Sequence, residues 1–77
     1  MKIATIFFAS PIARRAYLDA LRERMYGAGY APHYVTDYIR AHFGSKVGHV
    51  PGTDDAERAA DVALELRGVL CKLTEDA

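Results

Sequence analysis

The sequence has one cysteine, no tryptophan and no long apolar run, and these absences exclude several classes of protein. The single cysteine, Cys71, cannot form a disulfide within the chain or contribute to a zinc site made of several cysteines. No apolar stretch approaches the roughly 18 residues that cross a membrane. The N-terminal sequence MKIATIFFAS has a short apolar run, interrupted by Thr5, and leads directly into a charged segment. We therefore interpret it as a strand and not as a signal peptide, and we expect a cytoplasmic protein.

The net charge is zero, but the charges are unevenly distributed along the chain. Residues 1–50 contain seven Lys and Arg against three Asp and Glu, or +4, whereas residues 51–77 contain three against seven, or −4. Two interpretations are open: the halves attract each other in the fold, or they form a basic and an acidic face for partners of opposite charge. Overall neutrality argues against strong nucleic-acid binding, which usually needs a basic domain.

The length of 77 residues and the apolar share of 51% indicate one ordered domain, residues 1–77. Residues 2–8 predict a strand, because apolar side chains occur on both sides of the pleat, as in a strand that is covered on both faces. A strand needs a partner for its backbone groups. The candidates are a short strand at residues 46–50 and the same strand in a second copy of the protein.

Residues 10–43 predict two helices separated by glycines. Ser10 can cap the first helix, which Pro11 begins and which runs to about Tyr26. The sequence Gly-Ala-Gly at residues 27–29 ends it, and a second helix is expected over residues 32–43. Arg14 falls near the apolar side of the first helix, where its stem is expected to extend along the core towards solvent.

The C-terminal part predicts one long helix over residues 54–73, with Asp54 and Glu57 as a pair that caps its first turn. Its apolar residues recur at intervals of three and four: Ala59, Val62, Leu66, Val69 and Leu73. A second apolar line contains Ala60, Leu64 and Cys71, which suggests a homodimer or a docking surface. The expected fold is a small, mainly helical α+β domain with the order strand, helix, helix, short strand, long helix.

Tyrosines occur every four residues at positions 26, 30, 34 and 38, and His42 continues the series. Gly27, Gly29 and Pro32 interrupt any helix through the whole series. Only Tyr34, Tyr38 and His42 are therefore expected to share one helix. Tyr38 is expected to pack in the core with its hydroxyl at the surface. Tyrosine is also enriched at interaction hot spots, so the others form a candidate contact patch. The predicted partner-binding residues are Tyr26, Tyr30, Tyr34, Arg22, Asp61, Leu64 and Glu65.

The sequence contains no nucleophile elbow, no phosphate-binding glycine loop and no paired-carboxylate motif, so we predict no catalytic residue, cofactor or metal site. His33 and Asp37 lie four residues apart on one helix face, a spacing that allows a shared metal or proton but more often gives a surface contact. His42 is expected to be a hydrogen-bonded, partly buried imidazole, and Cys71 a small apolar residue.

Two resemblances concern the N-terminal half. The sequence Ala-Ser-Pro-Ile at residues 9–12 ends the first strand, and Ala-Leu-Arg-Glu-Arg at residues 20–24 and then Gly-Tyr at residues 29–30 follow it. This pattern resembles the first strand and helix of nucleoside 2-deoxyribosyltransferase-like enzymes. The later strands and carboxylates of those enzymes have no counterpart here. The two helices also resemble a helix-turn-helix, whose reading face would contain His33, Thr36, Asp37 and Arg40.

From these observations we predict a non-enzymatic protein-binding module that acts by covering a surface of its partner. Small single-domain chains without catalytic motifs are common among phage and mobile-element accessory proteins, including inhibitors of bacterial defence complexes. The alternative is a helix-turn-helix-like DNA-binding regulator. A protein partner or a homodimer is expected, nucleic acid is the less favoured partner, and no membrane is involved.

Overall fold

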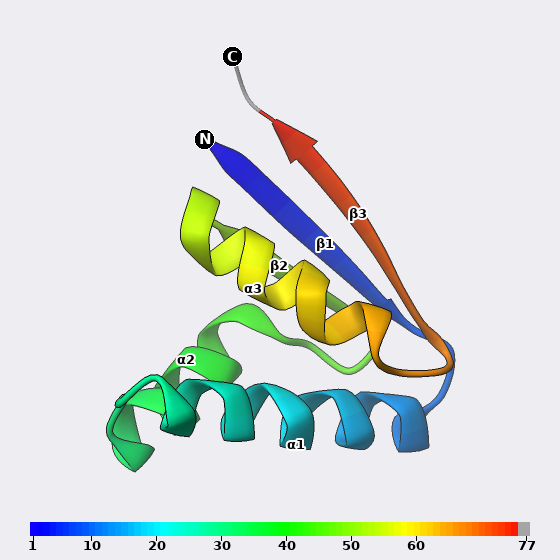
Figure 1. Cartoon of the computed structure of the whole chain (residues 1–77). Coiled ribbons are helices and arrows are strands. Elements are labelled where there is room, and N and C mark those ends of the chain that lie inside the picture. Colours follow the sequence, from blue (N-terminus) through cyan, green and yellow to red (C-terminus); the bar gives the residue numbers. More distant parts are fainter. Residues whose placement is uncertain (76–77) are drawn as a thin grey trace.

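The computed structural model describes residues 1–75, in which three helices lie on one side of a three-stranded antiparallel sheet (Figure 1). In chain order the elements are β1 (Lys2–Phe8), α1 (Pro11–Gly27), α2 (Pro32–His42), β2 (Val47–Pro51), α3 (Thr53–Leu64) and β3 (Val69–Glu75). The α+β class expected from the sequence is confirmed. None of the helices in this part of the chain is long and apolar enough to cross a membrane.

The first strand, β1, is the centre of the sheet, whose strand order is β2-β1-β3. On one side Ile3 pairs with Pro51, and on the other Lys2 pairs with Glu75. The predicted strand at residues 2–8 is confirmed, and so is its short partner within the chain, shifted by one residue to Val47–Pro51. Because both sides of β1 are paired within one chain, β1 has no edge left for a second copy.

The predicted helix over residues 54–73 is wrong in its second half. The helix α3 ends at Leu64, and the chain turns back into the edge strand β3. Gly68 in the turn has φ +75, which is not a helical conformation, and a Cβ there would lie 3.1 Å from the Cβ of Ala13, so any residue other than glycine would be strained. Without β3, the second side of β1 would leave its backbone groups unpaired. Pairing therefore outweighs the helical spacing of the apolar residues.

The cap predicted for the first helix is present in the structure, whereas the cap predicted for the last helix is not. Ser10 caps α1 as predicted, since its Oγ accepts a hydrogen bond from the backbone N–H of Ala13 at 3.1 Å. The predicted cap of the last helix by Asp54 and Glu57 is wrong, because α3 follows Gly52, which has φ +103, and no side chain caps it. Glycine tolerates this left-handed backbone, and the chain turns sharply from β2 into α3.

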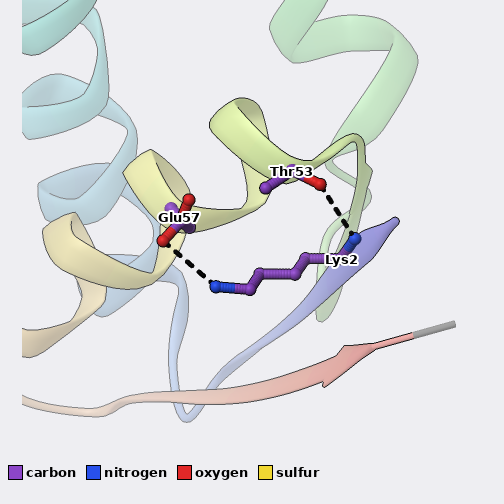
Figure 2. Close-up of polar contacts among 3 residues, drawn as sticks. All are labelled: Lys2, Thr53 and Glu57. Atoms are coloured by element: carbon purple, nitrogen blue, oxygen red, sulfur yellow. Dashed lines mark hydrogen bonds and ion pairs between the residues drawn. The ribbon is translucent and has the colours of Figure 1, made fainter. Parts of the chain in front are cut away.

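Lys2 ties the start of α3 to the start of β1 (Figure 2). Its backbone N–H donates to Thr53 Oγ1 at 3.3 Å, and its Nζ lies 3.2 Å from Glu57 Oε2. A second ion pair joins Arg24 of α1 to Glu65 at 2.8 Å. Both pairs connect the basic half of the chain to the acidic half, as the first interpretation of the charge distribution expects.

The core lies between the sheet and the helices, with Tyr17 of α1 at its centre. Tyr17 is fully buried, and its hydroxyl donates to the carbonyl oxygen of Ala59 in α3 at 2.9 Å. The rings of Phe8 and Phe43 pack against it, with centroids at 5.4 and 5.6 Å. Burial raises the pKa of Tyr17 well above its usual range, so the hydroxyl stays neutral and available as a donor.

The chain between α2 and β2 covers the outer edge of β2. Phe43 forms a β-bridge with Gly48, and the N–H of Gly44 donates to the carbonyl oxygen of Val47 at 2.9 Å. Arg14 holds this segment from α1, because its Nε donates to the carbonyl oxygen of Gly44 at 2.7 Å. Of the two outer edges of the sheet, the one at β2 is therefore protected.

Candidate functional site

Four rings stack in succession along α2, and we name them the tyrosine ladder: Tyr30, Tyr34, Tyr38 and His42. Successive centroids lie 5.3, 6.1 and 4.4 Å apart. Tyr30 precedes the helix, yet its ring is within 13° of parallel to that of Tyr34, so Pro32 does not interrupt the series. At the far end, His42 Nδ1 lies 3.1 Å from the carbonyl oxygen of His49. The prediction of a hydrogen-bonded, partly buried His42 is confirmed.

Arg58 of α3 lies against the ladder and closes one side of it. Its guanidinium carbon is 5.2 Å from the ring centroid of Tyr30 and 5.9 Å from that of Tyr38, and its Nη2 donates to Asp55 at 3.0 Å. Burial lowers the pKa of Arg58, but Tyr30, Asp55 and Tyr38 outweigh it and raise that pKa overall. Burial, assisted by Asp55, raises the pKa of Tyr38 to about 12. Tyr30 and Tyr34 remain 38% and 45% exposed, so they carry the accessible ring surface.

The structure places the other predicted partner-binding residues on α1 and at the end of α3. Tyr26 is exposed in the last turn of α1, and Arg22 is paired with Asp19 at 3.1 Å. Glu65 belongs to the ion pair with Arg24, whereas Asp61 and Leu64 are exposed. Only Tyr30 and Tyr34 of the predicted set are joined by a ring contact among the described residues. Their role as one partner-binding surface remains a prediction.

No element of residues 1–75 covers the face of the sheet that points away from the helices. Along β1, Ala4, Ile6 and Phe8 are buried towards the helices, while the residues between them point to the other side. The pairing register extends this alternation to β2 and β3. We name the uncovered side the open face; its residues are Ile3, Thr5, Phe7, Val47, His49, Pro51, Leu70, Lys72 and Thr74. The expectation that β1 is covered on both faces is therefore wrong.

One row of the open face is entirely apolar. Phe7 pairs with Val47 on one side and with Leu70 on the other, so the three side chains are direct neighbours across the sheet. They are 45%, 44% and 72% exposed. The row formed by His49, Thr5 and Lys72 is polar and adjoins it. Contiguous exposed apolar side chains with a polar rim are typical of interaction sites.

A scan against protein-family models finds no match for the chain, and searches of curated proteins and of solved structures find no significant match either. The resemblance of residues 1–30 to nucleoside 2-deoxyribosyltransferase-like enzymes thus finds no support beyond the quoted residues.

Groups suited to metal or covalent chemistry do not cluster in the structure. Residues 1–75 contain no group of three or more His, Cys, Asp or Glu that could hold a metal ion. His33 and Asp37 are both exposed on α2. Cys71 is half-buried against the core, and burial raises the pKa of its thiol, which keeps it protonated near neutral pH. The geometry of the described residues offers extended surfaces for contact.

Proposed function

We propose that this chain is a non-enzymatic protein-binding module that acts by covering a surface of its partner. The proposal rests on the row of Val47, Phe7 and Leu70. A domain of this size has a small core and modest stability. Apolar side chains that stay exposed on its surface therefore do not contribute to the free energy of folding. Fully burying one such side chain contributes about 1.5–3 kcal/mol. Three of them side by side on an uncovered sheet favour burial against a partner.

The chemistry of the open face defines the partner it fits. The apolar row at one end favours an apolar patch on the partner, and Lys72 in the neighbouring row favours an acidic group beside that patch. His42 and His49 connect this face to the tyrosine ladder, whose exposed rings of Tyr30 and Tyr34 offer a second contact area. A partner with a flat apolar surface and an acidic border fits the open face.

Charge distribution favours protein over DNA as the partner. Lys2, Arg22, Arg24 and Arg58 are each engaged in an ion pair within the chain. On α2, the reading face that a helix-turn-helix would use contains the acidic Asp37 among exposed residues. DNA binding stays the alternative. An inhibitor of a bacterial defence complex is the narrower form of the proposal, and only the partner's identity tests it.

Affinity capture from a bacterial lysate with matched variants tests the proposed surface. The variant Phe7→Thr with Leu70→Thr keeps β-forming residues but removes two members of the apolar row. We expect it to lose the proteins that the wild type retains. The control Ile12→Thr removes an isoleucine that is 83% exposed on α1 and should retain them. Equal capture by the double variant and the wild type would refute the open face as the binding surface.

Salt and nuclease separate the two partner classes in the same experiment. An interface dominated by apolar burial should change little between low and physiological salt. Binding through several phosphates loses on the order of 10³-fold or more in affinity over the same range. Retention that disappears with salt or with nuclease treatment would favour the DNA-binding alternative and count against the protein-binding module.

A further inference from the structure

The outer edge of β3 differs from that of β2 because no strand or loop of the described chain pairs with it. β3 has seven residues without proline or glycine, and its central charge is Lys72 alone. Such an edge presents unpaired backbone N–H and C=O groups and readily accepts another strand. Leu70 and Leu73, 72% and 44% exposed, lie on opposite faces of this strand. An added strand would therefore gain apolar contacts on both sides of the sheet.

One flank of α3 lies beside this edge and is also apolar. Ala60 and Leu64 are four residues apart, so they share one flank of the helix. The tyrosine ladder lies beside β2, where His42 contacts His49, so the flank of α3 turned away from the ladder is on the β3 side of the molecule. The opposite flank carries Arg58 and contacts the tyrosine ladder. The helix side of the β3 edge therefore combines Ala60 and Leu64 of α3 with Cys71 and Leu73 of β3.

We propose that β3 pairs antiparallel with β3 of a second copy, around a two-fold axis at Cys71. The two sheets would join into one of six strands, with the two α3 helices flanking the axis. In this register Cys71 faces Cys71 of the second copy, Val69 faces its Leu73 and Leu70 faces its Lys72. The turn before β3, which contains Arg67, then lies beside Glu75 of the second copy. The pairing uses the edge of the sheet and does not depend on the function proposed for the open face.

Charge and side-chain character select this register. The row facing the helices pairs Val69, Cys71 and Leu73 only with apolar residues, and the opposite charges of Arg67 and Glu75 meet at both ends. An axis at Lys72 would bring two lysines face to face, which is destabilising. An axis at Leu73 would place Glu75 against Cys71. An axis at Leu70 would leave only residues 69–71 of each strand paired, because the chain turns at Gly68, which has φ +75.

A second copy is the occupant favoured by this self-complementarity. Each copy offers the same edge, the same apolar flank and both members of the terminal charge pair, which is what an isologous two-fold interface requires. The net charge of zero means that two copies do not repel each other at long range. A standard protein–protein interface buries about 800 Å² on each partner. The α3 flank adds contact area to the strand edge, and a dimer would use both.

Sedimentation equilibrium over a wide concentration range tests the association. The mass is expected to rise from 8.5 kDa towards that of a dimer. Leu73→Lys, which places a charge in the apolar row, should keep the protein monomeric. Thr36→Lys adds the same charge at an exposed position on α2 and should dimerise normally. Circular dichroism of both variants checks that they are folded. A monomeric wild type at all concentrations would overturn the proposal.

Oxidation of Cys71 tests the register. Directly opposed antiparallel residues have Cα atoms about 4.5–5.5 Å apart, which falls within the range that a disulfide spans. Copper phenanthroline, which takes up the two electrons as two thiols lose their protons and form the S–S bond, should therefore cross-link the dimer rapidly. A dimer that remains uncross-linked would overturn the axis at Cys71.

Charge reversal gives a second test of the register that needs no oxidation. Arg67→Glu places a like charge beside Glu75 at each end of the paired strands and should raise the dimer dissociation constant by on the order of tenfold. Adding Glu75→Arg should restore it. Failure of the double variant to recover would refute the register. Phe7→Thr lies outside this interface, so a variant that still dimerises but captures no partner separates this proposal from the proposed function.

Discussion

Replacing Gly48 by alanine tests whether the ring of Phe43 holds the covered edge of β2 in place. A Cβ at residue 48 would overlap the ring atoms Cδ1 and Cε1 of Phe43. The ring has little room to move, because it is 5% exposed and its centroid lies 6.3 Å from that of Phe8 and 5.6 Å from that of Tyr17. Overpacking of this kind costs typically 1–3 kcal/mol. We expect Gly48→Ala to lower the free energy of unfolding by about 2 kcal/mol.

A double-mutant cycle in urea, followed by far-UV circular dichroism, identifies the cause of this loss. For a domain of this size, about 2 kcal/mol corresponds to a decrease of roughly 8–16 °C in Tm. Phe43→Leu should cost stability alone through lost packing, yet relieve part of the loss in the Gly48→Ala background. The coupling should amount to about 1 kcal/mol or more. Strictly additive losses would refute the explanation through the ring.

Gly27→Ala provides the matched control for that experiment. No atom outside the local helix lies within 4 Å of the position of its Cβ, and its φ is not positive. Alanine there reduces the entropy of the unfolded chain without a clash, so we expect no loss and a gain of up to about 1 kcal/mol. A loss comparable to that of Gly48→Ala would indicate a general intolerance of glycine replacement.

Three further changes probe the core and the turn into β3. Gly68→Ala should destabilise the fold by about 1–2 kcal/mol, because alanine is strained at φ +75 and its Cβ would lie 3.1 Å from that of Ala13. Thermal unfolding measures this loss, and unchanged stability would contradict the assigned turn. Tyr17→Phe should cost about 1 kcal/mol in urea unfolding, since it removes one buried hydrogen bond to Ala59, and no change would mean that the bond contributes nothing net. Burial raises the pKa of Tyr38 from 10.0 to about 12, so the folded state holds this proton more tightly than the unfolded state. The contribution of Tyr38 to stability should therefore be constant below pH 10 and be lost as the pH rises towards 12, and Tyr38→Phe should make the fall in stability over this range shallower.

Local signals in the sequence were reliable where short-range chemistry decides the structure. Ser10 and Pro11 begin α1, and residues 2–8 form a strand, because capping and strand propensity act within a few residues. The last third of the chain cannot be predicted in this way, because the apolar residues at positions 59–73 have a helical spacing although β3 begins at Val69. The choice between them depends on the unpaired side of β1, which lies more than sixty residues away in the sequence. The spacing of apolar residues within one segment does not show whether a distant strand lacks a pairing partner.

The candidate surfaces also depend partly on short-range signals and partly on contacts between residues that are distant in the sequence. The series of tyrosines was visible as a spacing, and its exposed members Tyr30 and Tyr34 do stack. That Tyr30 joins the ladder from outside the helix depends on how the loop before Pro32 is folded, and on Arg58, which comes from α3. The open face could not be foreseen, because Leu70 reaches it only when β3 is a strand and pairs with Phe7.

The central position of β1 has a consequence for how the chain folds during synthesis. Among these elements β1 is synthesised before the others, but its two neighbours in the sheet are β2 and β3, and β3 is the last of them in the chain. Until β3 emerges, one side of β1 lacks its partner, and Ala4 and Ile6 are only partly enclosed. Pairings of such long sequence separation slow folding. A nascent chain stalled before residue 69 would therefore expose a seven-residue apolar strand edge, which makes truncated products of this protein more prone to aggregation than the complete domain.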